Sequence, residues 1–428
     1  MESAIASNPH RSMVRTNPLA AGKVADHSII DLLDASRLAV VSTPRGRGTS
    51  REQAQEAFAG LQAVLEEQPH AMFVTNQTVF MREPEVEGYC RELLQGQYGS
   101  EPPPTNFVQQ APCDGSALTI EAWTIGGKSV RVERQDPHTL AVEYHGIRWV
   151  YCAGIQAPPE SASVYAQASA GLARLNGLLN EAGSGFAHVV RTWFYLGDIT
   201  GTAQNGTLRY HELNRARSDF YHDIRFCHSL LEPQAPRAVY PASTGIGTLG
   251  QGLELSCLTL QTERKDAFLL PLENPQQTPA YAYHPKYSHK SPKFTRAMAL
   301  VLEDYVTTWI SGTASVVNSE SCHEGKLEKQ TEQTIDNIER LIAPENFSLH
   351  GAPGVGASLH DLAKIRVYLK RGRDFSKCRA ICQRRFGAIP TIYAVADICR
   401  PELLVEIEGV AFSKRSRAVK LPEQNGGS

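Results

Sequence analysis

Apolar and polar residues follow the same order three times along the chain: a strand, a long helix, a strand, a second helix and two closing strands. The long helix of the second copy shows the pattern well, because Leu172, Leu175 and Leu179 recur at helical spacing. Such self-similarity indicates that one supersecondary unit is used three times. The predicted elements cover residues 38–43, 52–65, 72–80, 85–95, 106–110 and 118–125 in the first copy, 147–155, 164–179, 189–196, 208–221, 238–243 and 253–260 in the second, and 305–310, 327–342, 362–369, 375–386, 393–398 and 403–410 in the third.

Strands that alternate with two helices per copy predict an α+β fold, in which a mixed sheet carries its helices on one face. We expect repeats at residues 31–127, 128–262 and 298–415. A long connection without periodicity is either functional or disordered, and the segment from Thr262 to Arg296 contains five prolines and three tyrosines. The predicted non-repeat segments are a disordered or extended N-terminus at 1–30, an ordered linker at 263–297 and a flexible tail at 416–428.

Composition narrows the possible functions. The 428 residues include 43 Lys and Arg against 45 Asp and Glu, so no basic excess favours nucleic acid or an anionic membrane. No apolar run approaches the ~18 residues of a membrane helix, and the first 23 residues lack the apolar block of a signal peptide. We therefore expect a cytoplasmic protein that is a monomer or a weak homo-oligomer.

The cysteines do not indicate a disulfide framework or a metal site. There are nine of them, an odd number spread over the whole chain. The closest pair, Cys378 and Cys382, has no further ligands at a suitable spacing. We expect neither a metal nor a cofactor.

The last predicted strand carries two carboxylates on one face. Glu406 and Glu408 point the same way because strand side chains alternate, whereas Val405 and Ile407 take the other, buried face. On this pattern alone, the carboxylates are either an exposed, solvated pair or part of a catalytic site.

Local strings resemble the RidA (YjgF-like) family, whose small subunits form trimers with clefts between neighbours. The segments WISGTASVV (309–317) and PELLVEIEGVA (401–411) carry this likeness. One chain with three such units would be a covalent, internal pseudo-trimer. RidA imine deaminases have an arginine shortly after a Pro-Thr pair, and no copy has it here, which counts against imine hydrolysis.

The chain resembles the chorismatases more closely, from about Phe107 to Phe412. The strings LNRARSDFY (213–221), PASTGIG (241–247), YAYHPKYSHKSPKFTRA (281–297), SGTAS (311–315) and CRPELLVEIE (399–408) occur in order. The resemblance implies conversion of chorismate, a dianion with an enolpyruvyl ether, without a cofactor. The region up to about Asn106, which is most of the first repeat, is longer than the usual chorismatase N-terminus, and its role stays open.

The resemblance also assigns roles at the cleft between repeats two and three, the one seam that we expect to be active. Glu406 matches the general acid that protonates the enol ether, and Glu408 is expected to be structural. Arg217, Arg296 and Tyr283 match the groups that hold the substrate, although Arg215 could replace Arg217. Arg366 is a weaker candidate, and the segment 244–247 is expected to form a wall of the cleft.

Gly312 and Cys399 match the positions that separate two chorismatase subfamilies. The combination of glycine and cysteine resembles that of the subfamily that forms 3-hydroxybenzoate and pyruvate. The alternatives are hydrolysis to a dihydroxycyclohexadiene carboxylate, a RidA-like imine deaminase or a non-catalytic binding protein. For Cys399, a small buried apolar role is the competing interpretation.

Overall fold

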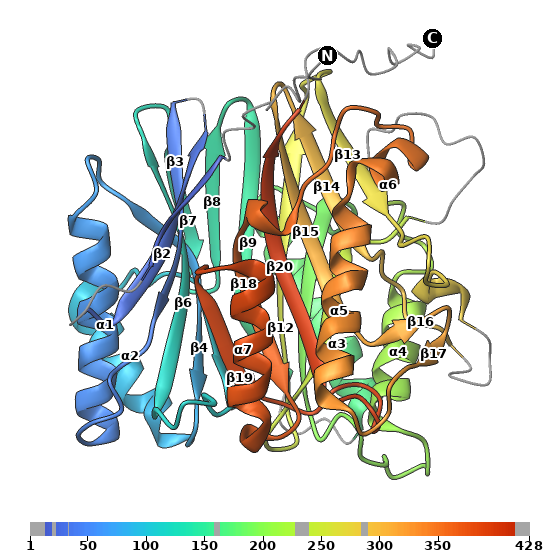
Figure 1. The fold of residues 1–428 in the computed structure, drawn as a ribbon. Coiled ribbons are helices and arrows are strands. Elements are labelled where there is room, and N and C mark those ends of the chain that lie inside the picture. Colours follow the sequence, from blue (N-terminus) through green and yellow to red (C-terminus); the bar gives the residue numbers. More distant parts are fainter. Residues whose placement is uncertain are drawn as a thin grey trace, which may run out of the picture.

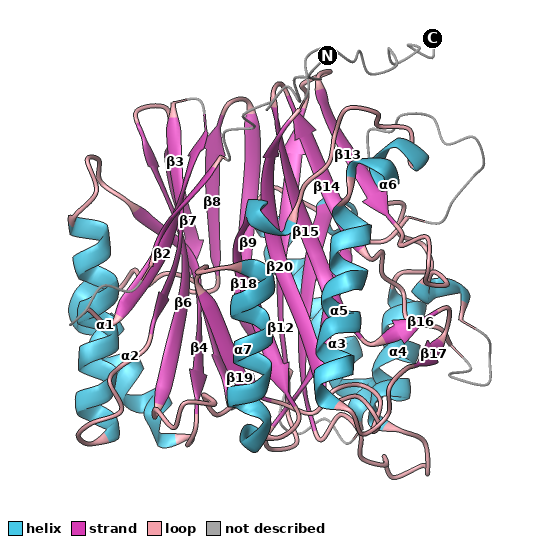
Figure 2. Ribbon diagram, in the orientation of Figure 1, coloured by secondary structure: helices cyan, strands magenta, loops and turns pink. Residues whose placement is uncertain are grey.

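Three six-stranded sheets stand around a common interior, and each carries two long helices on its outer face (Figure 1). The computed structural model describes residues 13–18, 23–32, 34–157, 163–226, 239–283 and 290–415. Helices and sheets form separate layers, with strands inside and helices outside (Figure 2). The three-repeat α+β fold predicted from the sequence is confirmed.

The three repeats contain the same eight elements in the same order. The first has β1 (Val14–Asn17), β2 (Ala25–Leu32), β3 (Ala35–Ser42), α1 (Ser50–Glu66), β4 (Phe73–Met81), α2 (Glu85–Tyr98), β5 (Thr105–Val108) and β6 (Leu118–Gly127). The second has β7 (Arg131–Asp136), β8 (Thr139–Tyr144), β9 (Ile147–Gln156), α3 (Val164–Glu181), β10 (Val189–Gly197), α4 (Arg209–Phe220), β11 (Ala242–Thr248) and β12 (Leu253–Thr262). The third has β13 (Ala267–Leu272), β14 (Ala297–Leu302), β15 (Tyr305–Ala314), α5 (Leu327–Ile342), β18 (Leu362–Leu369), α7 (Phe375–Phe386), β19 (Thr391–Val395) and β20 (Val405–Lys414). The third repeat also carries the short elements β16 (Val316–Val317), β17 (Glu320–Ser321) and α6 (Pro344–Leu349).

Each sheet has the same topology. The strand order is β1-β2-β3-β6-β4-β5 in the first sheet, β7-β8-β9-β12-β10-β11 in the second and β13-β14-β15-β20-β18-β19 in the third. The edge strands β5, β11 and β19 pair with their neighbours in parallel, and the other pairs are antiparallel. Each of these parallel edge strands borders the next repeat. We call the three contacts between neighbouring repeats the seams.

The boundaries predicted for the repeats are wrong in one respect. Two strands precede each predicted opening strand, so residues 14–17 and 25–32 belong to the first sheet rather than to an N-terminal extension. Likewise, residues 267–272 of the predicted linker form β13. These strands escaped detection because some are short and others are polar edges; in β7, every other residue is exposed. The predicted tail at 416–428 lies outside the described residues.

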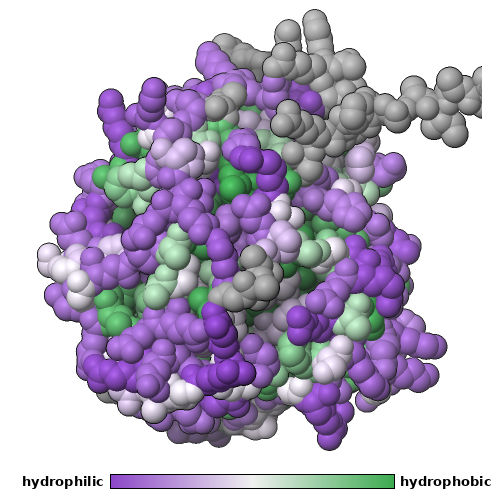
Figure 3. Space-filling view, turned by 60° about the vertical axis from the view of Figure 1, so that its left-hand side comes forward, coloured by the Kyte–Doolittle hydropathy of each residue, from purple (hydrophilic) through white to green (hydrophobic). Residues whose placement is uncertain are grey.

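The inner faces of the three sheets share one apolar core. Trp123, Trp149 and Trp309, one from each repeat, belong to it. Separate cores fill the space between each sheet and its helices. The face shown in Figure 3 is mostly hydrophilic, with apolar residues in small patches. Burial of the inner faces within one chain is what makes the molecule an internal pseudo-trimer.

Local sequence explains why the helices lie where they do. Helix α1 begins after Thr49, whose side chain forms a capping box with Glu52. Its buried positions include Ala54, Phe58 and Leu61, which form the stripe that packs on the sheet. In the described part of the chain, no helix is long and apolar enough to cross a membrane.

Candidate active site

A cavity of about 310 Å³ lies at the seam between the second and third repeats. Helix α4 and strand β11 form one side of it, and strands β15 and β20 form the other. The segment before β14 and the turn before β20 complete its wall. All six residues predicted for the site line this cavity, namely Arg217, Tyr283, Arg296, Gly312, Cys399 and Glu406.

Glu406 is a buried carboxyl group on β20. It is 4% exposed, and no group in the described residues donates a hydrogen bond to it. Burial, reinforced by the charge of Glu408, raises the pKa of Glu406 to about 8. The raised pKa favours the protonated form of Glu406, which lines the cavity.

Glu408 lies on the same face of β20, in a different environment. It is ion-paired with Arg191 at 2.6 Å and with Arg366 at 3.1 Å, and it accepts a hydrogen bond from Trp193 Nε1 at 3.1 Å. Burial disfavours its charge, but Arg366 and Arg191 outweigh burial, so the pKa of Glu408 is lowered. The alternative of a solvated pair is wrong, because both carboxylates are buried. The pKa values of two neighbouring carboxyl groups are therefore shifted in opposite directions.

Arg217 enters the cavity from α4. It is 2% exposed, and its Nη2 donates to Asn214 Oδ1 at 2.7 Å. Arg215, the alternative, pairs with Glu212 at 2.9 Å and does not line the cavity. Residues two apart on a helix face different sides, which is why only one of the two arginines reaches the seam. The geometry thus favours Arg217.

Arg296 and Tyr283 form a second polar cluster. Arg296 is 5% exposed, and its Nη2 donates to the Tyr283 hydroxyl and, at 3.3 Å, to the Thr278 carbonyl. Its guanidinium lies 5.4 Å from the centre of the Phe294 ring. These contacts fix the direction of the positive charge at one end of the cavity.

The predictions missed a third cation at the cavity, Arg400. Its guanidinium lies 5.4 Å from the centre of the Tyr283 ring, and its Nη1 donates to the Ser319 carbonyl at 2.9 Å and to Ser321 Oγ at 3.1 Å. The residue belongs to the quoted CRPELLVEIE string. Its anchor, the β16–β17 hairpin, has too few residues to show a strand pattern in the sequence.

Strand β11 offers a backbone donor to the cavity, in agreement with the wall predicted for residues 244–247. Outward-facing N–H groups alternate along this edge strand. Ser243 N donates to Ser311 Oγ at 2.8 Å, and Gly247 N donates to the Asp397 carbonyl at 2.8 Å. Gly245 lies between them and lines the cavity, so the same alternation directs its N–H away from β10 and toward the cavity.

Gly312 sets the distance between Glu406 and the facing strand. Its N–H donates to Thr244 Oγ1 at 3.0 Å. A Cβ atom added at Gly312 would lie 2.0 Å from Glu406 Oε1, so any side chain would displace the carboxyl group. Burial and the Glu406 charge raise the pKa of the Cys399 thiol to about 12, so this cavity-lining cysteine is a neutral, small group.

The equivalent carboxyl of the second repeat, Glu254, is engaged by the protein. Glu254 and Glu406 each pair with the residue two positions after an equivalent glycine, Gly154 or Gly312. Glu254 accepts a hydrogen bond from Phe107 N at 3.1 Å, across the seam between repeats one and two. The first repeat has Thr119 at this position, so it supplies no acid.

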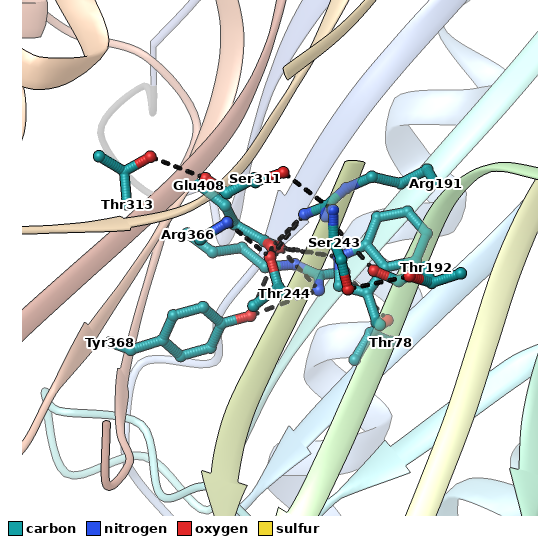
Figure 4. Close-up of polar contacts among 12 residues, drawn as sticks. Thr78, Arg191, Thr192, Ser243, Thr244, Ser311, Thr313, Arg366, Tyr368 and Glu408 are labelled. Carbon is teal, nitrogen blue, oxygen red and sulfur yellow. Dashed lines mark hydrogen bonds and ion pairs between the residues drawn. The ribbon is translucent and has the colours of Figure 1, made fainter. Parts of the chain in front are cut away.

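Arg366 lies away from the cavity. Figure 4 shows it beside Glu408, Arg191 and Thr244 in the interior between the sheets. It donates to Glu121 Oε1 at 2.9 Å and to the Tyr195 hydroxyl at 2.8 Å. Arg366 therefore stabilises the charge of its carboxylate neighbours rather than facing a ligand in the cavity.

The fold and this cavity define a class of three-repeat α+β protein with a buried acid and three arginines around one cavity at a seam. Comparison with known proteins identifies the family. The N-terminal family model "Chorismatase FkbO/Hyg5-like" matches residues 121–259. A 3-hydroxybenzoate synthase from Streptomyces hygroscopicus is 35% identical over 297 residues, which are 68% of this chain and 81% of that protein. A chorismatase from Streptomyces rapamycinicus is 31% identical over 275 residues, or 62% of this chain and 77% of its own. The chain belongs to the chorismatase family.

A crystal structure of a chorismatase has the same fold, with a TM-score of 0.65 and 22% sequence identity. It covers 89% of this chain and 100% of its own chain. This is more of the chain than the segment from Phe107 to Phe412, where the motifs occur. The fold match therefore extends into the first repeat, which is part of the shared architecture.

Proposed function

We propose that this protein converts chorismate to 3-hydroxybenzoate and pyruvate, with Glu406 as the general acid. The observation that carries the proposal is a buried carboxyl group with a raised pKa that shares one cavity with three arginines. A relative 35% identical over most of its length is a 3-hydroxybenzoate synthase, which supports the same substrate and product here.

Chorismate carries two carboxylates, and the cavity offers separate cationic groups for them. Arginine suits a carboxylate because its planar fork donates two parallel hydrogen bonds. We assign one carboxylate to Arg296 and the Tyr283 hydroxyl and the other to Arg217. The free N–H of Gly245 is a further donor to a substrate oxygen. Held in this way, the substrate does not repel Glu406, because Glu406 is neutral.

The chemical step begins with a proton. Glu406 transfers it to the methylene carbon of the enol ether, which leaves an oxocarbenium-like centre next to the ether oxygen. Breaking of the bond between ring C3 and the ether oxygen then releases pyruvate. The oxygen of the C4 hydroxyl bonds to C3 and its bond to C4 breaks, and loss of the C3 proton makes the ring aromatic. Chorismate has the atoms of 3-hydroxybenzoate plus pyruvate, so the reaction consumes no net water and Glu406 can be reprotonated.

We assign control of the product to Gly312 and Cys399. Gly312 leaves space next to Glu406 that a methyl group would fill. Cys399 adds a small neutral wall. Hydrolysis to the dihydroxycyclohexadiene carboxylate is the second candidate, because it starts with the same protonation and differs in that it consumes one water and leaves the ring non-aromatic.

The test is incubation of the purified protein with chorismate in the presence of EDTA, followed by chromatography of the products. We expect equal amounts of pyruvate and 3-hydroxybenzoate. Pyruvate with a non-aromatic diol would contradict the product assignment and keep the protonation step. Absence of pyruvate, in a sample shown to be folded, would contradict the enzymatic function.

A further inference from the structure

The pseudo-threefold symmetry of the interior is broken at one carboxylate. The strand between the two long helices of each repeat, β4, β10 or β18, contains a β-bulge. Asn76, Arg191 and Lys364 lie at equivalent positions directly after it. The residues two positions later pair with the closing strands β6, β12 and β20. Their partners are Glu121 in the first repeat, Ser256 in the second and Glu408 in the third. Two repeats thus place a carboxylate toward the interior, and the second places a hydroxyl.

Ser256 lines a small interior cavity of about 30 Å³ that is rich in positive charge. None of the charged residues around it is more than 4% exposed. Four cations face two carboxylates, namely Arg37, Arg191, Lys364 and Arg366 against Glu121 and Glu408.

Three of the cations already share both carboxylates. Lys364 and Arg366 pair with Glu121, with Lys364 Nζ at 2.6 Å. Arg191 pairs with Glu408 at 2.6 Å, and Arg366 also reaches Glu408, as Figure 4 shows. Both carboxylates are therefore already ion-paired, and the four cations still exceed them in charge.

Arg37 has aromatic and hydroxyl neighbours in place of an acid. Its Nη2 donates to the Tyr151 hydroxyl at 3.2 Å, and its guanidinium lies 5.1 Å from the centre of the Trp123 ring. Two polar atoms of cavity-lining residues, Arg37 Nε and Ser256 Oγ, have no hydrogen-bond partner within the described residues. Both residues are 4% exposed, so bulk water does not serve them.

Excess charge in a sealed interior is costly, because an ion loses its hydration and gains no counter-charge. A third carboxylate at Ser256 would have reduced the excess. A cavity of this size has room for a water or two or for one small ion. We propose that the interior binds a monovalent anion of about the size of chloride beside Ser256 and Arg37, where it takes the place of the missing third carboxylate.

Halide dependence of stability is the first test, with the full-length protein at constant ionic strength in chloride or in gluconate, which is too large for the cavity. An ion that binds only the native state raises Tm with a saturable dependence on its concentration. We expect Tm to be higher in chloride by at least a few degrees, and the Arg37→Met variant to lose the difference. Equal Tm values in the two salts for the wild type would overturn the proposal.

Substitution of Ser256 supplies a matched pair of variants. Ser256→Glu supplies the third carboxylate and should make Tm independent of chloride. Ser256→Gln, which has the shape of glutamate and no charge, should be no more stable in gluconate than the wild type. If neither variant folds, a crystal of the wild type grown in bromide decides the question. An anomalous peak in contact with Ser256 Oγ and the Arg37 guanidinium is expected, and water at that position would refute the anion site.

Discussion

Glu406→Gln is the substitution that separates the acid from its surroundings. Glutamine has the shape of a protonated glutamic acid and cannot donate a proton to carbon. No described group donates a hydrogen bond to the Glu406 carboxyl, so the substitution breaks no such contact. We expect the variant to fold and to release no pyruvate from chorismate.

The same variant should become more stable than the wild type as pH rises. Burial raises the Glu406 pKa from 4.5 to about 8, so between these values the native state holds a proton that the unfolded chain has released. Wild-type stability therefore falls with rising pH, by about 1.4 kcal/mol per unit for this group. Over that interval the loss reaches about 5 kcal/mol, an upper limit because water entering the cavity would stabilise the carboxylate. Glutamine does not titrate and escapes the loss.

Urea unfolding at pH 5, 7 and 9, followed by tryptophan fluorescence, measures the difference. The gain of Glu406→Gln over the wild type should be small at pH 5 and reach its plateau at about pH 8. Glu254→Gln is the matched control, because burial also raises the Glu254 pKa to about 8 but at the other seam. It should show a similar pH trend and keep its turnover. A gain that does not change with pH would refute the buried-acid argument, and loss of turnover in Glu254→Gln would refute the assignment of one active seam.

Other outcomes follow from the same geometry. The wild-type kcat/KM should fall as pH rises through about 8, because Glu406 must be protonated. A kcat/KM that does not change up to pH 10 would contradict this. Gly312→Ala should lower kcat at least about tenfold and change the pyruvate-to-aromatic ratio, because its Cβ displaces Glu406. Arg296→Lys should raise KM roughly tenfold, since lysine lacks the bidentate fork; an unchanged KM for chorismate would remove Arg296 from binding. Thr244→Val should lower kcat, because it removes the hydrogen bonds of the Thr244 hydroxyl with Gly312 N, Arg191 and Glu408, and Thr244→Ser should restore it; equal rates in the two variants would exclude this positioning role.

The sequence predicted the fold because the repeated helices and central strands carry strong periodic patterns. It failed where strands are polar edges: β7 alternates charged, exposed residues, so it reads as a linker. The site residues were predicted from short sequence motifs. Each motif lies at the seam because it is part of, or next to, a strand or helix that borders the cavity. Arg400 was missed because its position at the cavity depends on Tyr283 and on the short β16–β17 hairpin, which are distant in sequence. The role of Glu408 also depends on distance in sequence, since Arg191 is 217 residues away from it.

The three seams explain how one chain came to differ from a symmetric trimer. In a homotrimer, each seam would contain the same acid and the same facing strand. Here Glu406 and Gly245 both line a cavity, whereas Glu254 accepts a hydrogen bond from Phe107 N. Burial raises the pKa of both carboxyl groups, so the seam between repeats two and three is distinguished by the cavity that Glu406 lines and by the ion-paired Glu408 beside it. A cavity of this kind at one seam requires repeats that differ in sequence, because identical subunits would place the same residues at all three seams.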